Sequence, residues 1–166
     1  MEDQNKNELV ITRIFDAPLE LVWKMFTEPE MMKKWWGPKI FSCPHVEMDF
    51  RVGGKYLNCM RGSPAEGAPV QDFWSTGTYK EIVPMKKIVA TDSFADEKGN
   101  IVSSAHYGME GFPLEMLVTF EFVELPESKT KMTLTHKGIE KIDEKNRAGM
   151  DQGWNESFDK LTTNLK

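Results

Sequence analysis

The sequence predicts an α+β fold in which one antiparallel sheet packs against one long amphipathic helix. Between residue 39 and about His136 the apolar side chains recur with a period of two, which is typical of half-buried strands joined by short turns. From Glu144 to Leu165 the period changes to three and four, which places the large apolar side chains on one stripe of a helix. That stripe consists of Met150, Trp154, Phe158, Leu161 and Leu165. A sheet with one apolar face and a helix with one apolar stripe can bury each other.

A strand and two short helices are expected before this region. Residues 9–15 alternate between two faces and predict a strand. Asp16-Ala17-Pro18 predicts a helix start, with the aspartate as the cap and the proline in the first turn. Thr27-Glu28-Pro29-Glu30 has the pattern of a capping box, so a second short helix is expected to follow and to end before Gly37-Pro38. We expect Leu9, Ile11 and Phe15 on one face of the strand, and Trp23 and Phe26 in the core beneath the first helix.

Six further strands are expected to complete the sheet. Gly53-Gly54 predicts a bulge or turn between two of them. A long connection, residues 96–113, is rich in Gly and Ser, and connections of that length are often mobile or functional. The predicted strands lie at residues 46–50, 55–60, 73–83, 88–94, 115–124 and 129–136.

Two glycines interrupt the C-terminal helical pattern. Gly149 and Gly153 each cost about 1 kcal/mol relative to alanine inside a helix. Two compensations remain open: close packing of the helix against the sheet, or room beside the helix for a ligand.

The overall composition limits the classes of function. A chain of 166 residues suits a single domain, residues 1–166, with a substantial core. The net charge of −5, without any basic run, argues against a nucleic-acid or anionic-membrane partner. No apolar run approaches the roughly 20 residues that span a bilayer.

The cellular location is expected to be the cytoplasm. Residues 1–7 are polar and lack the apolar centre of a signal peptide. Cys43 and Cys59 are too few for a disulfide framework and are expected to be reduced thiols.

Several short motifs, in order along nearly the whole chain, carry a resemblance to a known family. They are Phe15-Asp16-Ala17-Pro18 with Val22-Trp23, Thr27-Glu28-Pro29-Glu30, Trp35-Trp36-Gly37-Pro38, Gly53-Gly54 before Tyr56, Met60-Arg61-Gly62, Gly77 with Tyr79, Glu81-Ile82 with Pro84, Thr133-Leu134-Thr135-His136, and Gly153-Trp154 with Phe158 and Leu161. Together they resemble the SRPBCC or START-like superfamily, and within it the branch named for the C-terminal domain of the activator of heat-shock protein 90 ATPase.

The resemblance implies a helix-grip fold of the START-like, Bet v type. In that fold a curved, seven-stranded antiparallel sheet grips a long C-terminal helix, two short helices follow the first strand, and an apolar cavity lies between sheet and helix. It leaves the function open, because members of the superfamily include co-chaperones, polyketide cyclases, and lipid and hormone binders.

The inventory of reactive side chains argues against most enzymes and against a metal or cofactor. The chain has three histidines, and Cys43-Pro44-His45 supplies two ligands where a structural zinc site needs four. No nucleophile elbow, phosphate loop or dinucleotide fingerprint occurs. Cys59, on a strand beside Met60, is expected to be a small core residue, and His136 a hydrogen-bonded structural histidine.

A pocket is therefore the main functional expectation. Tyr56, Asn58 and Tyr79 would orient a mostly apolar ligand. The alternative is that the same residues simply fill a core rich in methionine and tryptophan. The predicted lining is Trp36, Tyr56, Asn58, Met60, Tyr79, Phe94, Met116, Val118, Met150, Trp154 and Phe158.

Three functional hypotheses follow. The first is binding of a small apolar or aromatic molecule by a monomer or weak dimer, without covalent chemistry. The second is a chaperone-associated module; against it stands the expected single domain, without the N-terminal domain through which full-length eukaryotic activators engage their chaperone. The third is a polyketide-cyclase-like enzyme with Tyr56, Tyr79 or His136 as the proton donor.

Overall fold

The computed structural model describes residues 7–166, and one seven-stranded antiparallel sheet runs through this part of the chain. Residues 1–6, within the polar start for which no signal peptide is expected, lie outside the described residues. The strand order is β1-β7-β6-β5-β4-β3-β2. The elements are β1 (Glu8–Phe15), α1 (Leu19–Thr27), α2 (Pro29–Met32), β2 (Ser42–Met48), β3 (Lys55–Gly62), β4 (Gln71–Val83), β5 (Lys87–Ala95), β6 (Met116–Leu125), β7 (Lys129–Lys137) and α3 (Glu144–Asn164), with a short 3-10 helix at Ser104–Tyr107.

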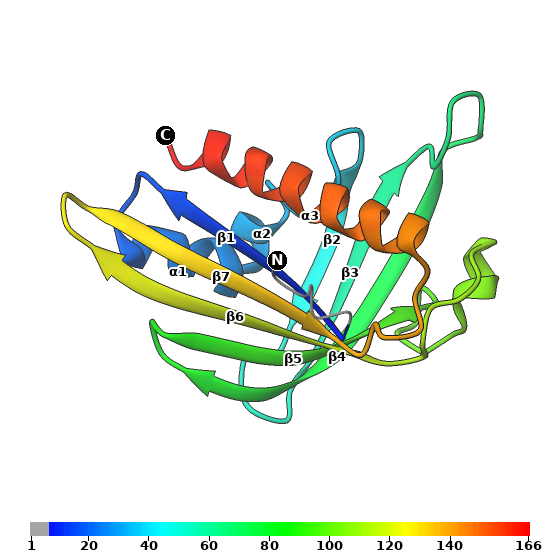
Figure 1. The fold of residues 1–166 in the computed structure, drawn as a ribbon, viewed down its shortest axis with the longest axis horizontal. Coiled ribbons are helices and arrows are strands. Elements are labelled where there is room, and N and C mark those ends of the chain that lie inside the picture. The colour runs from blue at the N-terminus through cyan, green and yellow to red at the C-terminus, as the bar shows by residue number, and fades with distance from the viewer. Residues whose placement is uncertain (1–6) are drawn as a thin grey trace, which may run out of the picture.

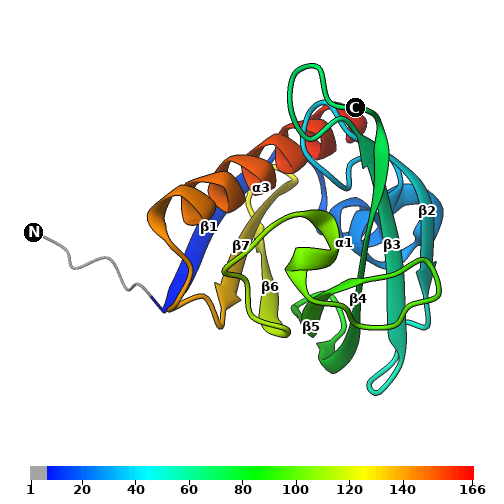
Figure 2. The same ribbon diagram turned by 90° about the vertical axis from the view of Figure 1, so that its right-hand side faces the viewer.

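The sheet is curved, and all three α-helices lie on its concave side (Figure 1). Seen from the end, α3 runs along β1, while α1 lies between α3 and the middle of the sheet (Figure 2). The predicted α+β helix-grip fold is therefore confirmed, including its seven strands and the two short helices after the first strand.

The alternation predicted for the first strand is also confirmed. Leu9, Ile11 and Phe15 are buried, whereas Val10, Thr12 and Ile14, which alternate with them on β1, are exposed. Val10 is 51% exposed and Ile14 is 62% exposed. Because β1 pairs with β7, and β7 with β6, without a register shift, this also assigns the concave face on those two strands.

The second short helix follows the first at once, as predicted, but the predicted capping side chains of the two helices are wrong. The N-cap of α1 is Pro18, and no side chain caps it, because the helix begins only at Leu19 and Asp16 lies too far upstream. The cap of α2 is Glu28, also without a side-chain cap, since α1 continues through Thr27 and leaves a single residue between the helices. The hydroxyl of Thr27 instead donates to the carbonyl of Trp23, 3.0 Å away within α1.

The second short helix is also shorter than expected. It ends at Met32, and Trp35 and Trp36 follow in a turn. Trp35 is fully buried there, and its indole N–H donates to the carbonyl of Met25 over 2.7 Å. Phe26, buried as predicted, packs against the ring of Trp35, with 4.8 Å between centroids, while Trp23 is half-buried at the edge of this core.

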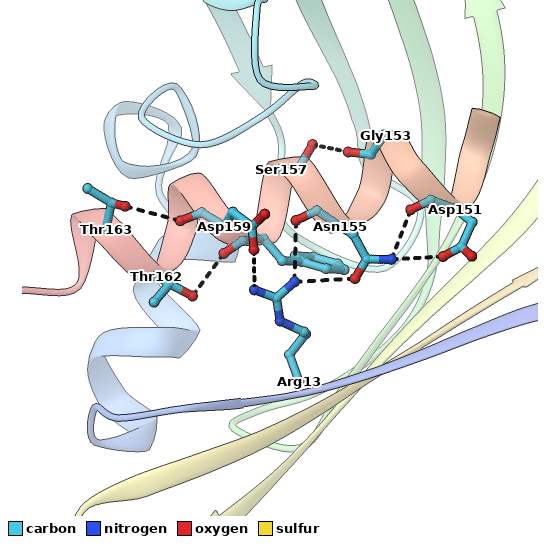
Figure 3. Close-up of polar contacts among 9 residues, drawn as sticks. Arg13, Asp151, Gly153, Asn155, Ser157, Asp159, Thr162 and Thr163 are labelled. Atoms are coloured by element: carbon cyan, nitrogen blue, oxygen red, sulfur yellow. Dashed lines mark hydrogen bonds and ion pairs between the residues drawn. The ribbon is translucent and has the colours of Figure 1, made fainter. Parts of the chain in front are cut away.

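Polar contacts fix α3 above the sheet. Arg13 reaches up from β1 and donates to Asp159 Oδ1 at 2.6 Å and to Asn155 Oδ1 at 3.2 Å (Figure 3). At the same end of the helix, Lys160 Nζ donates to the carbonyls of Pro38 and Phe41, at 3.0 and 2.9 Å. The C-terminal half of α3 is therefore tied both to the sheet edge and to the segment that follows α2.

Candidate functional site

A small cavity lies between the concave face of the sheet and the α1–α2 segment. Its volume is about 30 Å³. That is room for a water molecule or two, whereas a cavity that holds benzene measures about 150 Å³. The lining consists of Phe26, Met32, Trp36, Tyr56, Asn58, Tyr79, Ile88, Ala90, Val118 and Phe120.

The cavity brings together five of the eleven residues that the sequence analysis proposed. They are Trp36, Tyr56, Asn58, Tyr79 and Val118. The other six lie outside this lining, and they include every proposed residue of the C-terminal helix. These six are Met60, Phe94, Met116, Met150, Trp154 and Phe158.

Trp154 explains why α3 does not line the cavity. Its ring packs edge-on against Trp36, stacks on Phe158 and lies near Phe120, with centroid separations of 5.6, 5.6 and 5.8 Å. Its indole N–H also donates to His136 Nδ1 on β7, 3.1 Å away. The side chain thus occupies space between α3 and the sheet, and the cavity described above lies beneath α1 and α2.

Phe94 belongs to a separate aromatic group under the long connection between β5 and β6. Its ring contacts Phe112 and Tyr107, with centroids 5.5 and 6.1 Å apart. The hydroxyl of Tyr107 donates to the carbonyl of Ala95, which holds the connection onto the end of β5. The long connection is therefore packed onto the sheet through these rings.

Tyr56 joins the cavity lining to β5. Its hydroxyl donates a hydrogen bond shared by the carbonyl of Thr91 (2.9 Å) and Asp92 Oδ1 (3.1 Å). Gly77 on β4 makes this possible, because a Cβ there would lie 2.6 Å from the Tyr56 ring and 1.9 Å from the Thr91 carbonyl oxygen. The close approach, rather than a special backbone angle, requires glycine at this position.

Asp92 is a residue of the site that sequence reasoning missed. Burial raises the pKa of its carboxyl to about 6, against the lowering effect of the hydrogen bond from Tyr56. The signal was available: Asp92 follows Ile88 and Ala90 at a spacing of two, so it shares their inward face. We overlooked Asp92 because most side chains of β5 are apolar or small.

His136 faces Asp92 from β7. Its side chain is 3% exposed, and burial lowers the pKa of the imidazole to about 4, so the ring is neutral at pH 7. Because Nδ1 accepts the Trp154 N–H, the proton resides on Nε2, which lies 3.8 Å from Asp92 Oδ2. That separation is too long for a direct hydrogen bond. The prediction of a hydrogen-bonded structural histidine agrees with the contact to Trp154.

Asn58, in the cavity wall, has unused hydrogen-bonding capacity. Asn58 is 1% exposed, and its Oδ1 atom has no partner. Tyr79 is also buried, its pKa is raised mainly by that burial, and it packs against Phe50 and Tyr56 with centroids 5.1 and 5.8 Å away. The wall is thus aromatic and aliphatic with few polar groups, as in many small-molecule sites.

The described part of the chain offers little else for chemistry. Residues 7–166 contain no group of three or more side chains placed to hold a metal ion. Cys43 and Cys59 are buried free thiols, and burial raises their pKa values to about 11 and about 12. Thiols with such values stay protonated at neutral pH and are poor nucleophiles. Within the same residues, no helix is both long enough and apolar enough to cross a membrane.

Comparisons with solved structures agree with the fold. A protein from Chromobacterium violaceum is 28% identical, with a TM-score of 0.71 over 96% of this chain and 96% of that one. A protein from Arthrobacter aurescens is 25% identical, with a TM-score of 0.77 over 98% and 89%. A third, from Nitrosomonas europaea, is 23% identical, with a TM-score of 0.73 over 97% and 95%. No curated protein sequence matches the chain.

The family follows from the sequence as a whole. The model of the family described as "Activator of Hsp90 ATPase homolog 1-like protein" matches residues 16–166. This match spans the two short helices, the six later strands and α3, and it confirms the resemblance carried by the short motifs. The chain therefore belongs to the activator of Hsp90 ATPase homolog 1-like family.

Proposed function

We propose that this chain binds a small, mostly apolar or aromatic molecule in the cavity between the concave face of the sheet and the α1–α2 segment. The observation that carries the proposal is the composition of the cavity wall. Nine of the ten lining residues are aromatic, aliphatic or methionine side chains, and Asn58 is the exception. Such walls reward burial of an apolar ligand by roughly 25 cal/mol per Å².

Binding requires the cavity to enlarge. The present volume of about 30 Å³ is well below that of an aromatic ring. Beside the buried Phe26, Met32 and Trp36 form the wall on the side of the short helices, and the Trp36 side chain is half-buried at the surface. Methionine adapts its shape readily, so movement of these two side chains is the route by which we expect space to open.

A ligand-observed NMR screen tests the proposal. Lipids, flavonoids and other aromatic metabolites are screened against the wild type and against Ala90→Val, which adds two methyl groups inside the cavity. Thr12→Val also introduces a valine, but at an exposed position on the outer face of β1, and serves as the control. We expect binding to the wild type and to Thr12→Val, with at least a tenfold loss for Ala90→Val. Absence of any saturable ligand would overturn the proposal.

A chaperone-associated role is the second candidate, because the family is described as activator of Hsp90 ATPase homolog 1-like. It predicts that the purified protein binds an Hsp90-type chaperone and changes its ATPase rate. If neither binding nor a rate change occurs at micromolar protein, this candidate is rejected, whatever the outcome of the ligand screen.

Binding is a better account of the site than proton-transfer catalysis. The Tyr56 hydroxyl is already engaged by Thr91 and Asp92, and Nδ1 of His136 is engaged by Trp154.

The two free, buried thiols suit a reducing compartment, and we place the binding activity in the cytoplasm.

A further inference from the structure

The side-chain amide of Asn58 has one satisfied end and one unsatisfied end. Its Nδ2 group donates to the sulfur of Met32, 3.8 Å away. A thioether sulfur only accepts hydrogen bonds, so this contact identifies the NH₂ end and leaves the carbonyl end, Oδ1, without a partner. An amide oxygen that is buried without a partner costs roughly 1–3 kcal/mol, and a bound molecule could remove that cost.

The surroundings of Asn58 define what such a molecule must carry. Asn58 lies on β3 two residues after Tyr56, so both side chains share the concave face, and both line the cavity. An amide oxygen accepts hydrogen bonds and donates none. A ligand group that satisfies it must therefore be an O–H or an N–H.

The charge of the cavity wall narrows the class further. Its lining contains no Lys, Arg or His. The carboxylate of Asp92 accepts the hydrogen bond of the lining residue Tyr56 at 3.1 Å. A carboxylate or phosphate ligand would therefore be buried without a counter-ion and close to another negative charge, which is strongly unfavourable.

Resting on the proposed function, we propose that the cavity selects neutral aromatic molecules that present an N–H or O–H donor to Asn58 Oδ1. Asn58 is the specificity-determining residue, and the aromatic wall supplies the apolar contact. Neutral molecules of the same shape without a donor bind more weakly, and anionic analogues are excluded.

Indole and benzofuran provide a matched pair of probes, because they share one shape and differ in an N–H group against an ether oxygen. Their dissociation constants for the full chain are measured by protein-observed NMR titration, together with that of indole-3-carboxylate as the anionic probe. We expect indole to bind the wild type about tenfold more tightly than benzofuran, since one satisfied buried acceptor is worth about that factor. We expect no saturable binding of indole-3-carboxylate.

Asn58→Leu keeps the size of the side chain and removes the acceptor. In this variant the ratio of the two dissociation constants is expected to fall to about one, while Thr12→Val keeps the wild-type ratio. The wild-type ratio stands as a test even if Asn58→Leu does not fold.

The outcomes separate this inference from the proposed function. Equal affinity of indole and benzofuran for the wild type, or binding of indole-3-carboxylate as tight as that of indole, overturns the selectivity and leaves the binding function standing. Failure of both neutral probes and of the wider ligand screen to bind overturns both.

Discussion

The indole N–H of Trp154 donates a hydrogen bond to Nδ1 of His136 over 3.1 Å, and this contact joins α3 to β7. It settles the tautomer of the buried imidazole and holds the Trp154 ring in the gap between helix and sheet. Through the proton on Nε2, His136 then faces Asp92, which accepts the hydrogen bond of Tyr56. A line of polar side chains thus crosses the concave face from the helix to the wall of the cavity.

Trp154→Phe tests the contact between α3 and β7. It removes the donor and leaves a buried acceptor without a partner, so we expect a loss of about 2–4 kcal/mol in the free energy of unfolding, from the lost hydrogen bond and the smaller ring. Urea denaturation measures the change. Trp36→Phe is the control, because Trp36 has a similar partial burial and no indole hydrogen bond is found for it within residues 7–166. Equal losses in the two variants would show that the hydrogen bond contributes little.

Asp92 and His136 should affect the pH dependence of stability in opposite directions. The folded-state pKa of Asp92 is raised from 3.8 to about 6, so the folded protein binds this proton more tightly than the unfolded chain, and stability falls as pH rises from about 4 to 6. The folded-state pKa of His136 is lowered from 6.5 to about 4, so stability rises over nearly the same range. In the wild type the two effects largely cancel.

Two variants separate these contributions. Relative to wild type, Asp92→Asn should lose stability as pH is lowered from 6 to 4, because only the histidine contribution remains. His136→Gln should gain stability over that interval, because only the aspartate contribution remains. Denaturant unfolding at pH 4, 5 and 6 measures both differences. Differences that do not change with pH would mean that neither group titrates with a shifted pKa.

Gly149→Ala should stabilise the protein. A Cβ at Gly149 would meet no atom within 4 Å, and one at Gly153 would lie 3.5 Å from Pro38 Cγ, an ordinary contact. Close packing therefore requires neither glycine. We expect a gain of about 1 kcal/mol for Gly149→Ala, from helix propensity alone, measured as a higher midpoint in thermal unfolding. A loss of stability would show that the backbone of α3 needs glycine at this position for another reason.

Gly77→Ala should have the opposite effect. The added Cβ would overlap the Thr91 carbonyl oxygen and the Tyr56 ring, so β4 and β5 must separate or the ring must move. We expect a loss of more than 2 kcal/mol in unfolding free energy. Thr78→Ala, at the next position of β4, is the control. A near-neutral Gly77→Ala would contradict the packing of Tyr56 against β4.

Much of the fold could be predicted from the sequence, because periodicity reports which face of an element is buried. The alternation of residues 9–15 and the helical stripe ending at Leu161 and Leu165 both describe local geometry, and both agree with the structure. The capping residues could not be predicted, because α1 begins only at Leu19 and continues through Thr27, so that neither Asp16 nor Thr27 occupies a cap position.

The candidate site could be predicted only in part. Strand positions such as Tyr56, Asn58 and Val118 follow from alternation alone. Trp154, held by its hydrogen bond to His136 on β7, occupies space between α3 and the sheet. No local pattern contains that information, and the expected cavity beneath the C-terminal helix is occupied by this one side chain.

The most direct test of the central claim is a proton–nitrogen correlation spectrum of labelled protein, titrated with indole. The account predicts saturable shifts of amides around Asn58 on β3 and around Met32 and Trp36, with smaller changes along α3. Shifts confined to α3 and to residues 96–113, or no saturable shift with indole or any compound of the ligand screen, would contradict binding in this cavity.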